Sequence, residues 1–171
     1  MAGTEGDYFM AKTEMINVLT IGRTEGYVKK SSAYNPYVPS DIYDWDFKLV
    51  CGNYLFTDSY RGFNPYSGVE NIYIKNQDEP IWSCDYIGYI LENTPVSAEE
   101  IYGFLKEGRG NHLLDCVGSL FIDYSYKKGN FEYQTKFQDH CKAILQREEI
   151  YYSGSLAGIQ ISAGYLQEKK Y

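Results

Sequence analysis

The sequence has few basic residues for its acidic ones: 16 Lys and Arg against 23 Asp and Glu, a formal net charge of −7. A field of that sign repels polyanions, which makes duplex DNA, RNA and anionic membranes poor partners. Long apolar runs are also missing, since no stretch approaches the roughly 20 residues of a membrane span. The first residues, MAGTEGDYF, lack the basic and apolar segments of a secretion signal. We therefore expect a cytoplasmic protein that binds neither duplex nucleic acid nor membrane.

Motifs that bind metals or phosphate, or that carry out catalysis, are also missing from the sequence. The four cysteines show no CxxC spacing, and in such a chain we expect them to be buried apolar side chains. A zinc site is the less favoured alternative, because it would need His112 and Cys116 together with His140 or Cys141 from far along the chain. The sequence shows no phosphate-cradling glycine loop and no nucleophile–base pair. We therefore expect no metal, no cofactor and no catalytic residue.

Tyrosine is what the chain has in excess, with 19 in 171 residues, and aromatic residues reach 17%. Tyrosine favours strands and combines a flat apolar face with a polar tip, which suits a twisted sheet with one partly wet face. It also covers binding surfaces at low entropic cost. Composition allows both interpretations. The length and a hydrophobic content of 44% predict a single domain over residues 1–171.

The N-terminal quarter combines one helix with one long loop. Apolar residues recur at helical spacing from Phe9 to Ile21 and predict a helix over about residues 7–21, which Gly22 ends. The segment 29–44 contains prolines and paired serines that prevent regular structure, and it carries three tyrosines. Such a loop serves either as a lid over a pocket or as a segment that wraps the core.

The rest of the chain, a core predicted over residues 45–162, consists mainly of short strands and tight turns. A capping box of Ser97 and Glu100 starts one central helix, which we expect to end at Gly108. The predicted class is therefore α+β, a twisted antiparallel β-sheet packed by an N-terminal helix and a central helix. The strands are predicted as a hairpin over 45–60, then 70–75, 80–89, 120–126, 131–137, 141–146, 150–153 and 156–162. A loop is predicted over 61–68 and a turn over 147–149.

A short pattern occurs twice in the chain. Residues 52–56 (GNYLF) and 129–133 (GNFEY) share the order glycine, asparagine, aromatic, any residue, aromatic, at an offset of 129 − 52 = 77. Two explanations are open. Two hairpins use the same turn chemistry independently, or an ancient duplication produced two similar β units that flank a helix.

The segment GNYLFTDSYRGFNPYSGVENIYIKNQDEPIWSCDYIG has a distinctive order of aromatic and glycine positions. It resembles an uncharacterised bacterial and phage family, a domain of unknown function that sometimes follows a helix-turn-helix domain. Members show D-x-Y, then G, F-x-G-x-E, a strand and I-W-x-x-x-Y-x-G. The matching positions are Asp58, Tyr60, Gly62, Phe63 or Tyr66, Gly68, Glu70, Ile81, Trp82, Tyr86 and Gly88. The resemblance covers about residues 45–162, and members usually carry methionine and asparagine where this chain has Cys84 and Asp85.

The resemblance implies a small-molecule-binding or interaction module with no established activity. The residues themselves suggest where a ligand would bind, because a guanidinium among aromatic faces suits a flat anionic ligand. Solvated cations and core aromatics are the alternative interpretation. The candidate ligand-binding residues are Tyr60, Arg61, Phe63, Tyr66, Glu70, Trp82, Asp85, Tyr86 and Arg109.

We therefore expect a non-enzymatic domain that senses or sequesters a small, nucleotide-like ligand. In a phage, this would be an anti-defence sponge that removes a host signalling nucleotide. The alternative is a protein–protein interaction factor of the inhibitor or immunity type. A third interpretation is a hydrolase that uses paired carboxylates of Asp58, Glu70 or Asp85. A homodimer is also expected, because one small core cannot bury so many aromatic side chains.

Overall fold

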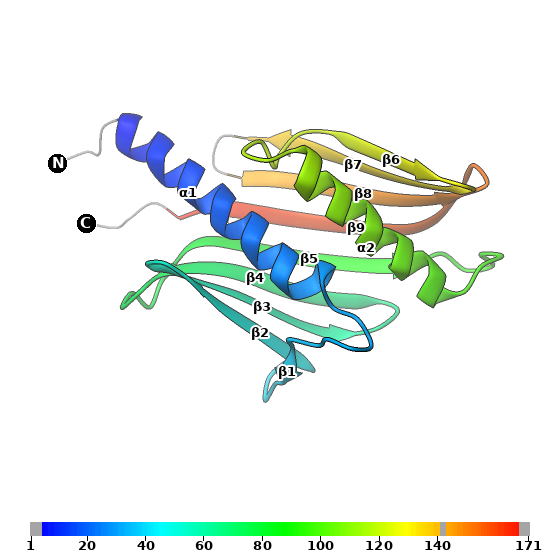
Figure 1. Ribbon diagram of the computed structural model, residues 1–171, viewed down its shortest axis with the longest axis horizontal. Coiled ribbons are helices and arrows are strands. Elements are labelled where there is room, and N and C mark those ends of the chain that lie inside the picture. The colour runs from blue at the N-terminus through cyan, green and yellow to red at the C-terminus, as the bar shows by residue number, and fades with distance from the viewer. Residues whose placement is uncertain (1–4, 141–142, 168–171) are drawn as a thin grey trace.

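The described part of the chain forms one open antiparallel sheet of nine strands with two helices on one face (Figure 1). The computed structural model describes residues 5–140 and 143–167, with side chains from Lys12 onward. The helices are α1 (Glu5–Arg23) and α2 (Ala98–Asp115), and a π-helical turn, η1 (Thr24–Val28), continues α1. The predicted α+β class with a twisted antiparallel sheet is confirmed. No helix in these ranges is both long and apolar enough to cross a membrane.

The strand order β1-β2-β3-β4-β5-β9-β8-β7-β6 places β5 beside β9 in the middle of the sheet. The sheet therefore consists of two meanders, β2 to β5 and β6 to β9, and one helix precedes each of them. The strands are β1 (Val38–Pro39), β2 (Trp45–Cys51), β3 (Tyr54–Gly62), β4 (Tyr66–Ile74), β5 (Pro80–Ile90), β6 (Tyr124–Lys128), β7 (Phe131–Asp139), β8 (Ala143–Tyr152) and β9 (Ser155–Leu166).

The two halves agree in detail. Gly52 and Gly129 both adopt positive φ, 58° and 59°, in the turns that join β2 to β3 and β6 to β7. Helix α1 crosses Phe56 at Gly22, where an added Cβ would lie 2.4 Å from the ring. Helix α2 crosses Tyr133 at Gly108 in the same way, and the corresponding distance is 2.5 Å. Phe56 and Tyr133 are the last residues of the repeated sequence pattern, so the pattern marks equivalent places in the two halves.

The prediction that Gly108 ends the central helix is wrong, because α2 continues to Asp115. A glycine inside a helix costs about 1 kcal/mol relative to alanine, but here the ring of Tyr133 occupies the space of a side chain. The capping box at the start of α2 is confirmed, since the Ser97 hydroxyl accepts from the Glu100 N–H and the Glu100 carboxylate accepts from the Ser97 N–H. Helix α1 likewise continues through Gly22 to Arg23.

The predicted turn over 147–149 is also wrong. Strand β8 passes through these residues without interruption, and Glu148 lies in its centre at 2% exposure. Three charged residues in a row indicated a surface turn, but the buried Glu148 has a cationic partner, Arg109 of α2. The predicted loop over 61–68 is likewise mostly strand, since β3 runs to Gly62 and β4 begins at Tyr66. Cys141, at the start of one predicted strand, lies outside the described residues.

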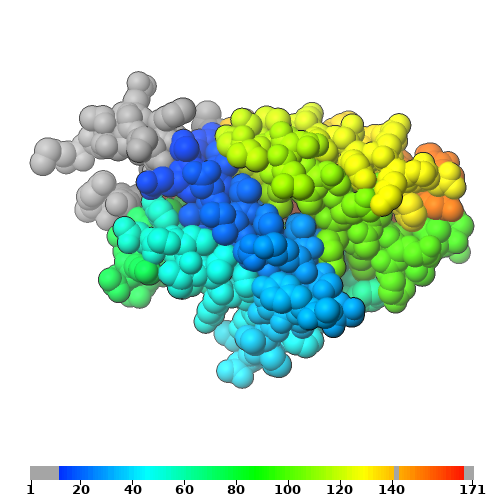
Figure 2. All heavy atoms as spheres, in the orientation of Figure 1, coloured from blue at the N-terminus to red at the C-terminus, as the bar shows by residue number. Residues whose placement is uncertain are grey.

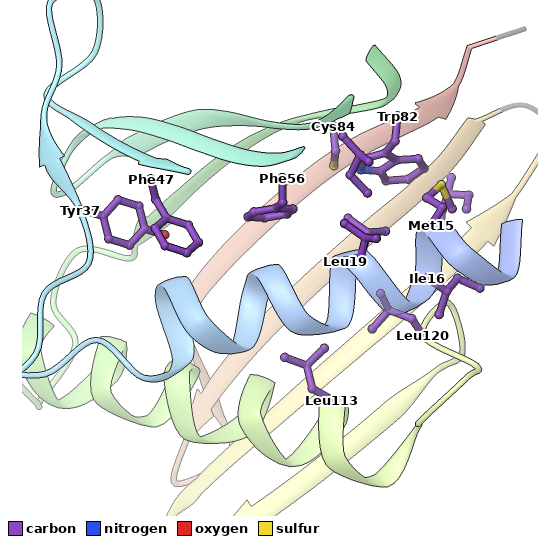
Figure 3. Packing of buried hydrophobic residues seen from close by; sticks show 13 residues of the cluster. Met15, Ile16, Leu19, Tyr37, Phe47, Phe56, Trp82, Cys84, Leu113 and Leu120 are labelled. Carbon is purple, nitrogen blue, oxygen red and sulfur yellow. The ribbon is translucent and has the colours of Figure 1, made fainter. Parts of the chain in front are cut away.

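The largest core cluster lies mainly between α1 and the first meander, and it also includes Leu113 of α2, Leu120 and Ile144 of β8 (Figure 3). Met15 and Leu19 point from α1 toward the sheet, where Phe56 and Trp82 meet them. These four side chains are at most 1% exposed, which makes apolar burial the main stabilising term for this helix. A second cluster joins α2 to the second meander. It contains Ile101, Phe104, Leu105, Tyr133, Ile150 and Ala157.

Candidate ligand-binding cavity

A cavity of about 420 Å³ lies between the helices and the middle of the sheet. Its walls come from the end of α1, from η1 and from α2, and its floor comes from both meanders. Figure 2 shows the face on which α1, the loop after it and α2 cover the sheet. Pockets for small molecules typically measure roughly 300–1,000 Å³, so the cavity has room for a compact ligand.

Strand alternation decides which predicted residues reach the cavity. Asp58 and Tyr60 line it from β3, whereas Arg61 lies 4.5 Å from the ring of Tyr43 and is exposed. On β5, Tyr86 lines the cavity and its neighbour Asp85 is exposed. Successive side chains of a strand point to opposite faces of the sheet, so adjacent residues in the sequence do not share a site.

Two tyrosines on the cavity floor lie over glycines of the neighbouring strand. Tyr66 of β4 is paired with Gly88 of β5, and Gly68 of β4 is paired with Tyr86 of β5. A Cβ on either glycine would lie 2.4 Å from the tyrosine that covers it. Both glycines are therefore needed for space. Gly88 leaves room for Tyr66, whose hydroxyl donates to Gln160 Oε1 at 2.6 Å.

Asp58 accepts two hydrogen bonds from phenols at one wall of the cavity. Tyr37 Oη donates to Oδ2 at 2.5 Å, and Tyr86 Oη donates to Oδ1 at 2.7 Å. Burial raises the pKa of Asp58 to about 6, although both phenol hydrogen bonds lower it. Tyr37 belongs to the long loop predicted over 29–44, and at 5% exposure its side chain packs into the core beside the cavity, although most of the loop is exposed.

Glu70 and Arg23 form a two-point ion pair on the first half of the floor. Arg23 Nε donates to Oε2 at 2.9 Å and Nη2 donates to Oε1 at 2.6 Å. Trp82 Nε1 donates to the same carboxylate at 3.1 Å. Burial opposes the charge on Arg23, but the Glu70 carboxylate raises the pKa of the guanidinium above its ordinary value. Trp82 is thus a buried support for Glu70 and does not line the cavity.

Arg109 and Glu148 form the equivalent pair in the second half. Arg109 Nε and Nη2 donate to the carboxylate at 2.9 and 2.6 Å, and Nη2 also donates to Gln160. Tyr133 Oη donates to Glu148 at 2.7 Å, and the Arg109 guanidinium lies 4.8 Å from the Tyr27 ring. Burial raises the pKa of Glu148, but Arg109 outweighs it and the net shift is downward. Arg109 therefore favours the charged form of the buried Glu148 carboxylate.

Lys30 and Lys106 are different from these arginines. Lys30 Nζ donates to Tyr60 Oη at 2.6 Å and lies 5.1 Å from the Tyr37 ring centre. Lys106 Nζ donates to the backbone carbonyl of Lys30 at 2.6 Å. Among the residues that the structure describes, neither ammonium is paired with a carboxylate. Burial lowers the pKa of both lysines. The Asp58 carboxylate partly opposes this shift at Lys30, and the charge of Lys30 lowers the pKa of Lys106 further.

The structure brings together most of the predicted binding residues and leaves three elsewhere. Tyr60, Phe63, Tyr66, Glu70, Tyr86 and Arg109 line the cavity. Arg61, Trp82 and Asp85 do not line it. The sequence-based prediction missed the residues of α1, η1 and the adjoining loop. A signal for Arg23 was present, because Gly22-Arg23 in the first helix matches Gly108-Arg109 in the second. The missed lining residues include Arg23, Tyr27, Lys30, Tyr37, Glu99, Tyr102, Lys106, His112, Tyr133, Gln146, Glu148 and Gln160.

The fold and the cavity define an α+β domain in which a helix-covered antiparallel sheet encloses an aromatic and charged pocket. The family described as Domain of unknown function (DUF5680) matches residues 58–166, and the chain belongs to that family. The match begins at Asp58 and includes Glu70 and Glu148, the two glutamates that are paired with arginines. Helix α1 and the loop that follows it precede the matched residues. Comparisons with curated proteins and with solved structures gave no match.

Proposed function

We propose that this chain is a non-enzymatic domain that binds a small, flat, anionic ligand of the nucleotide type and senses or sequesters it. The observation that carries the proposal is the pair of lysines, Lys30 and Lys106, which line an aromatic cavity and form no ion pair with a carboxylate of the described residues. In a phage, such a protein would remove a host signalling nucleotide from solution.

The charges around the cavity favour binding of an anion between Lys30 and Lys106. Arg23 and Arg109 are each neutralised by a buried glutamate, so their charges are already compensated. In the described part of the chain, Lys30 donates to a phenol and Lys106 to a backbone carbonyl, and the Asp58 carboxylate acts on Lys30 through its charge without forming an ion pair. An anionic group between them would gain charge-assisted hydrogen bonds in a partly buried setting. The overall charge of −7 acts at longer range and is screened at physiological salt.

Aromatic side chains provide faces for the rest of the ligand. Phe63 and Tyr102 meet edge to face with ring centres 5.1 Å apart, and Tyr66 and Tyr102 do so at 5.6 Å. All three line the cavity. Stacking of a base on an aromatic ring is worth about 1–3 kcal/mol and tolerates any base, so these residues suit a planar ring.

Binding is favoured over hydrolysis because protein side chains already occupy the oxygens of Asp58 and Glu70. Asp58 and Glu70 face each other across β3 and β4, but two phenols hold Asp58, and Arg23 and Trp82 hold Glu70. A general base needs an oxygen free to take a proton from substrate or water. Asp85, the third carboxylate of the hydrolase hypothesis, is exposed and does not line the cavity.

The test is binding of ribonucleoside 5′-monophosphates and cyclic dinucleotides, measured by thermal shift and then by calorimetry. A ligand at about 100 times its Kd adds about 2.7 kcal/mol to stability, which raises the melting temperature. Lys30→Met and Lys106→Met should each weaken binding by about tenfold or more, as expected for a lost charged hydrogen bond. Lys48→Met, an exposed residue of β2, is the matched control and should leave binding unchanged. Absence of any shift across the panel rejects the proposal.

Protein interaction is the second candidate, and one surface favours it. Ile87 of β5 and Ile161 of β9 are cross-strand partners, and they are 49% and 48% exposed. Exposed apolar clusters of this kind occur at protein interfaces. The predicted homodimer remains a prediction, and analytical ultracentrifugation tests it. A dimer through this surface should dissociate in Ile161→Lys, whereas a monomeric wild type removes this option.

A further inference from the structure

His112 of α2 carries a buried nitrogen that the fold does not use. The side chain is 3% exposed and lines the cavity, and its Nε2 has no hydrogen-bond partner in the described chain. The ring stacks on Tyr124 with centres 5.1 Å apart and lies 5.8 Å from Phe137. A buried polar atom without a partner costs about 1–3 kcal/mol, so native proteins rarely leave one without a reason.

The chemistry of the ring determines what Nε2 can accept. Burial lowers the pKa of His112, which makes the imidazole neutral at pH 7, and a hydrogen bond to the backbone of Ile122 occupies one ring nitrogen as donor. Since Nε2 is the atom without a partner, Nδ1 carries the proton. A neutral imidazole has one donor and one acceptor. Nε2 is therefore a free acceptor, and only an N–H or O–H group satisfies it.

We infer that Nε2 of His112 binds a hydrogen-bond donor of the ligand, so that the ligand carries an N–H or O–H group as well as an anionic group. This inference rests on the proposed function of the cavity. His112 follows Lys106 by six positions on one helix, and a rise of 1.5 Å per residue separates them by about 9 Å along the axis. A nucleoside monophosphate has this order of groups, with a phosphate at one end and donors on its ribose and base.

The state of His112 is tested first without any ligand. Long-range ¹H–¹⁵N spectra of the ¹⁵N-labelled wild type at pH 7.5 report which ring nitrogen carries the proton. The exposed His140 is the internal reference, because these are the two histidines of the chain. The expected result is a neutral ring with a proton on Nδ1 and none on Nε2. A proton on Nε2, or a charged ring, overturns the inference.

Binding is tested with the four ribonucleoside 5′-monophosphates and with inorganic phosphate, which lacks the ribose and base donors. A bound nucleotide should shift the Nε2 resonance of His112, while phosphate should leave it in place. His112→Phe keeps a flat ring against Tyr124 and should weaken nucleotide binding by about tenfold without changing phosphate affinity. If this variant does not fold, the wild-type spectra alone test the inference, because they show whether a bound nucleotide shifts the Nε2 resonance of His112.

The possible outcomes separate the two proposals. A nucleotide that binds wild type and His112→Phe equally, with no shift at Nε2, overturns the role of His112 and leaves the cavity as a binding site. Loss of affinity in the lysine variants together with a shift at Nε2 supports both proposals. No binding of any of the four nucleotides to the wild type overturns the inference about His112, and the cyclic dinucleotides then decide whether the proposed function is rejected as well.

Discussion

Arg109 on α2 and Glu148 on β8 hold the second helix to the second meander through two hydrogen bonds of 2.9 and 2.6 Å. The side chains are 18% and 3% exposed, so each charge depends on the other for compensation. Replacement of Arg109 by methionine leaves Glu148 buried without its partner. We expect a loss of about 3–5 kcal/mol in the free energy of unfolding, measured by urea denaturation.

The exposed pair of Lys127 and Glu132 provides the control for this measurement. Lys127 is 70% exposed in that pair, and surface ion pairs contribute about 0–1 kcal/mol. Lys127→Met should therefore be close to neutral. The double variant Arg109→Met, Glu148→Met should recover part of the loss, because it removes the uncompensated charge. Equal effects of Arg109→Met and Lys127→Met refute the structural role of the buried pair.

Gly22 and Gly103 are helical glycines with opposite surroundings. A Cβ at Gly22 would lie 2.4 Å from the Phe56 ring, whereas a Cβ at Gly103 would have no atom within 4 Å. Alanine improves helix propensity by about 1 kcal/mol at both positions. At Gly22, overpacking should exceed this gain and produce a net loss of about 1–3 kcal/mol. Gly103→Ala should stabilise by about 0.5–1 kcal/mol, and thermal unfolding compares the two. A stable Gly22→Ala protein would show that α1 does not pack closely on Phe56.

Asp58 should make stability depend on pH in an unusual direction. Its pKa is raised from 3.8 to about 6, mainly by burial. The folded state therefore binds more protons than the unfolded chain between about pH 4 and pH 6, and stability falls as the pH rises through this window. The expected contribution is roughly 2–3 kcal/mol. It is measured as the difference between wild type and Asp58→Asn in denaturant unfolding at several pH values.

Wild type must be compared with Asp58→Asn because His112 changes the pH dependence of stability in the opposite direction. Burial lowers the pKa of His112, so protonation of the unfolded chain reduces stability as the pH falls below about 6.5. This contribution is common to wild type and Asp58→Asn and cancels in the comparison. A difference that does not change with pH would show that Asp58 titrates normally in the folded protein.

Tyr37 should be the main anchor of the loop after η1. Its hydroxyl donates to Asp58 at 2.5 Å and its ring is 5% exposed. Tyr37→Phe keeps the ring and removes the donor, which should cost about 1.5–3 kcal/mol, as for other hydrogen bonds to charged groups. Tyr34→Phe is the control, since Tyr34 is 45% exposed and should change stability by less than about 0.5 kcal/mol. Chemical denaturation of both variants provides the comparison.

Local chemistry in the sequence predicted several elements correctly. The capping box of Ser97 and Glu100 starts α2, and the repeated Gly-Asn pairs close two hairpins at positive-φ glycines. These features depend on residues a few positions apart, so a short stretch of sequence contains the information. The α+β class follows from the same local patterns.

Errors arose where a distant residue outweighed the local pattern. Gly108 has the local properties of a helix end, but the ring of Tyr133 needs the space there. Residues 147–149 have the composition of a turn, but Arg109 stabilises Glu148 inside the sheet. Neither Tyr133 nor Arg109 is close to these positions in the sequence.

The sequence by itself determined the class of fold, the helix start at Ser97, the hairpin turns and some of the aromatic residues that surround the cavity, such as Tyr66 and Tyr86. Tertiary structure alone decided that Arg61 and Asp85 do not line the cavity and that Lys30, Lys106 and His112 do. The physical reason is that a cavity is a property of packed elements. Its lining depends on strand parity and on where α1 and α2 cross the sheet, which only contacts over long sequence separations specify.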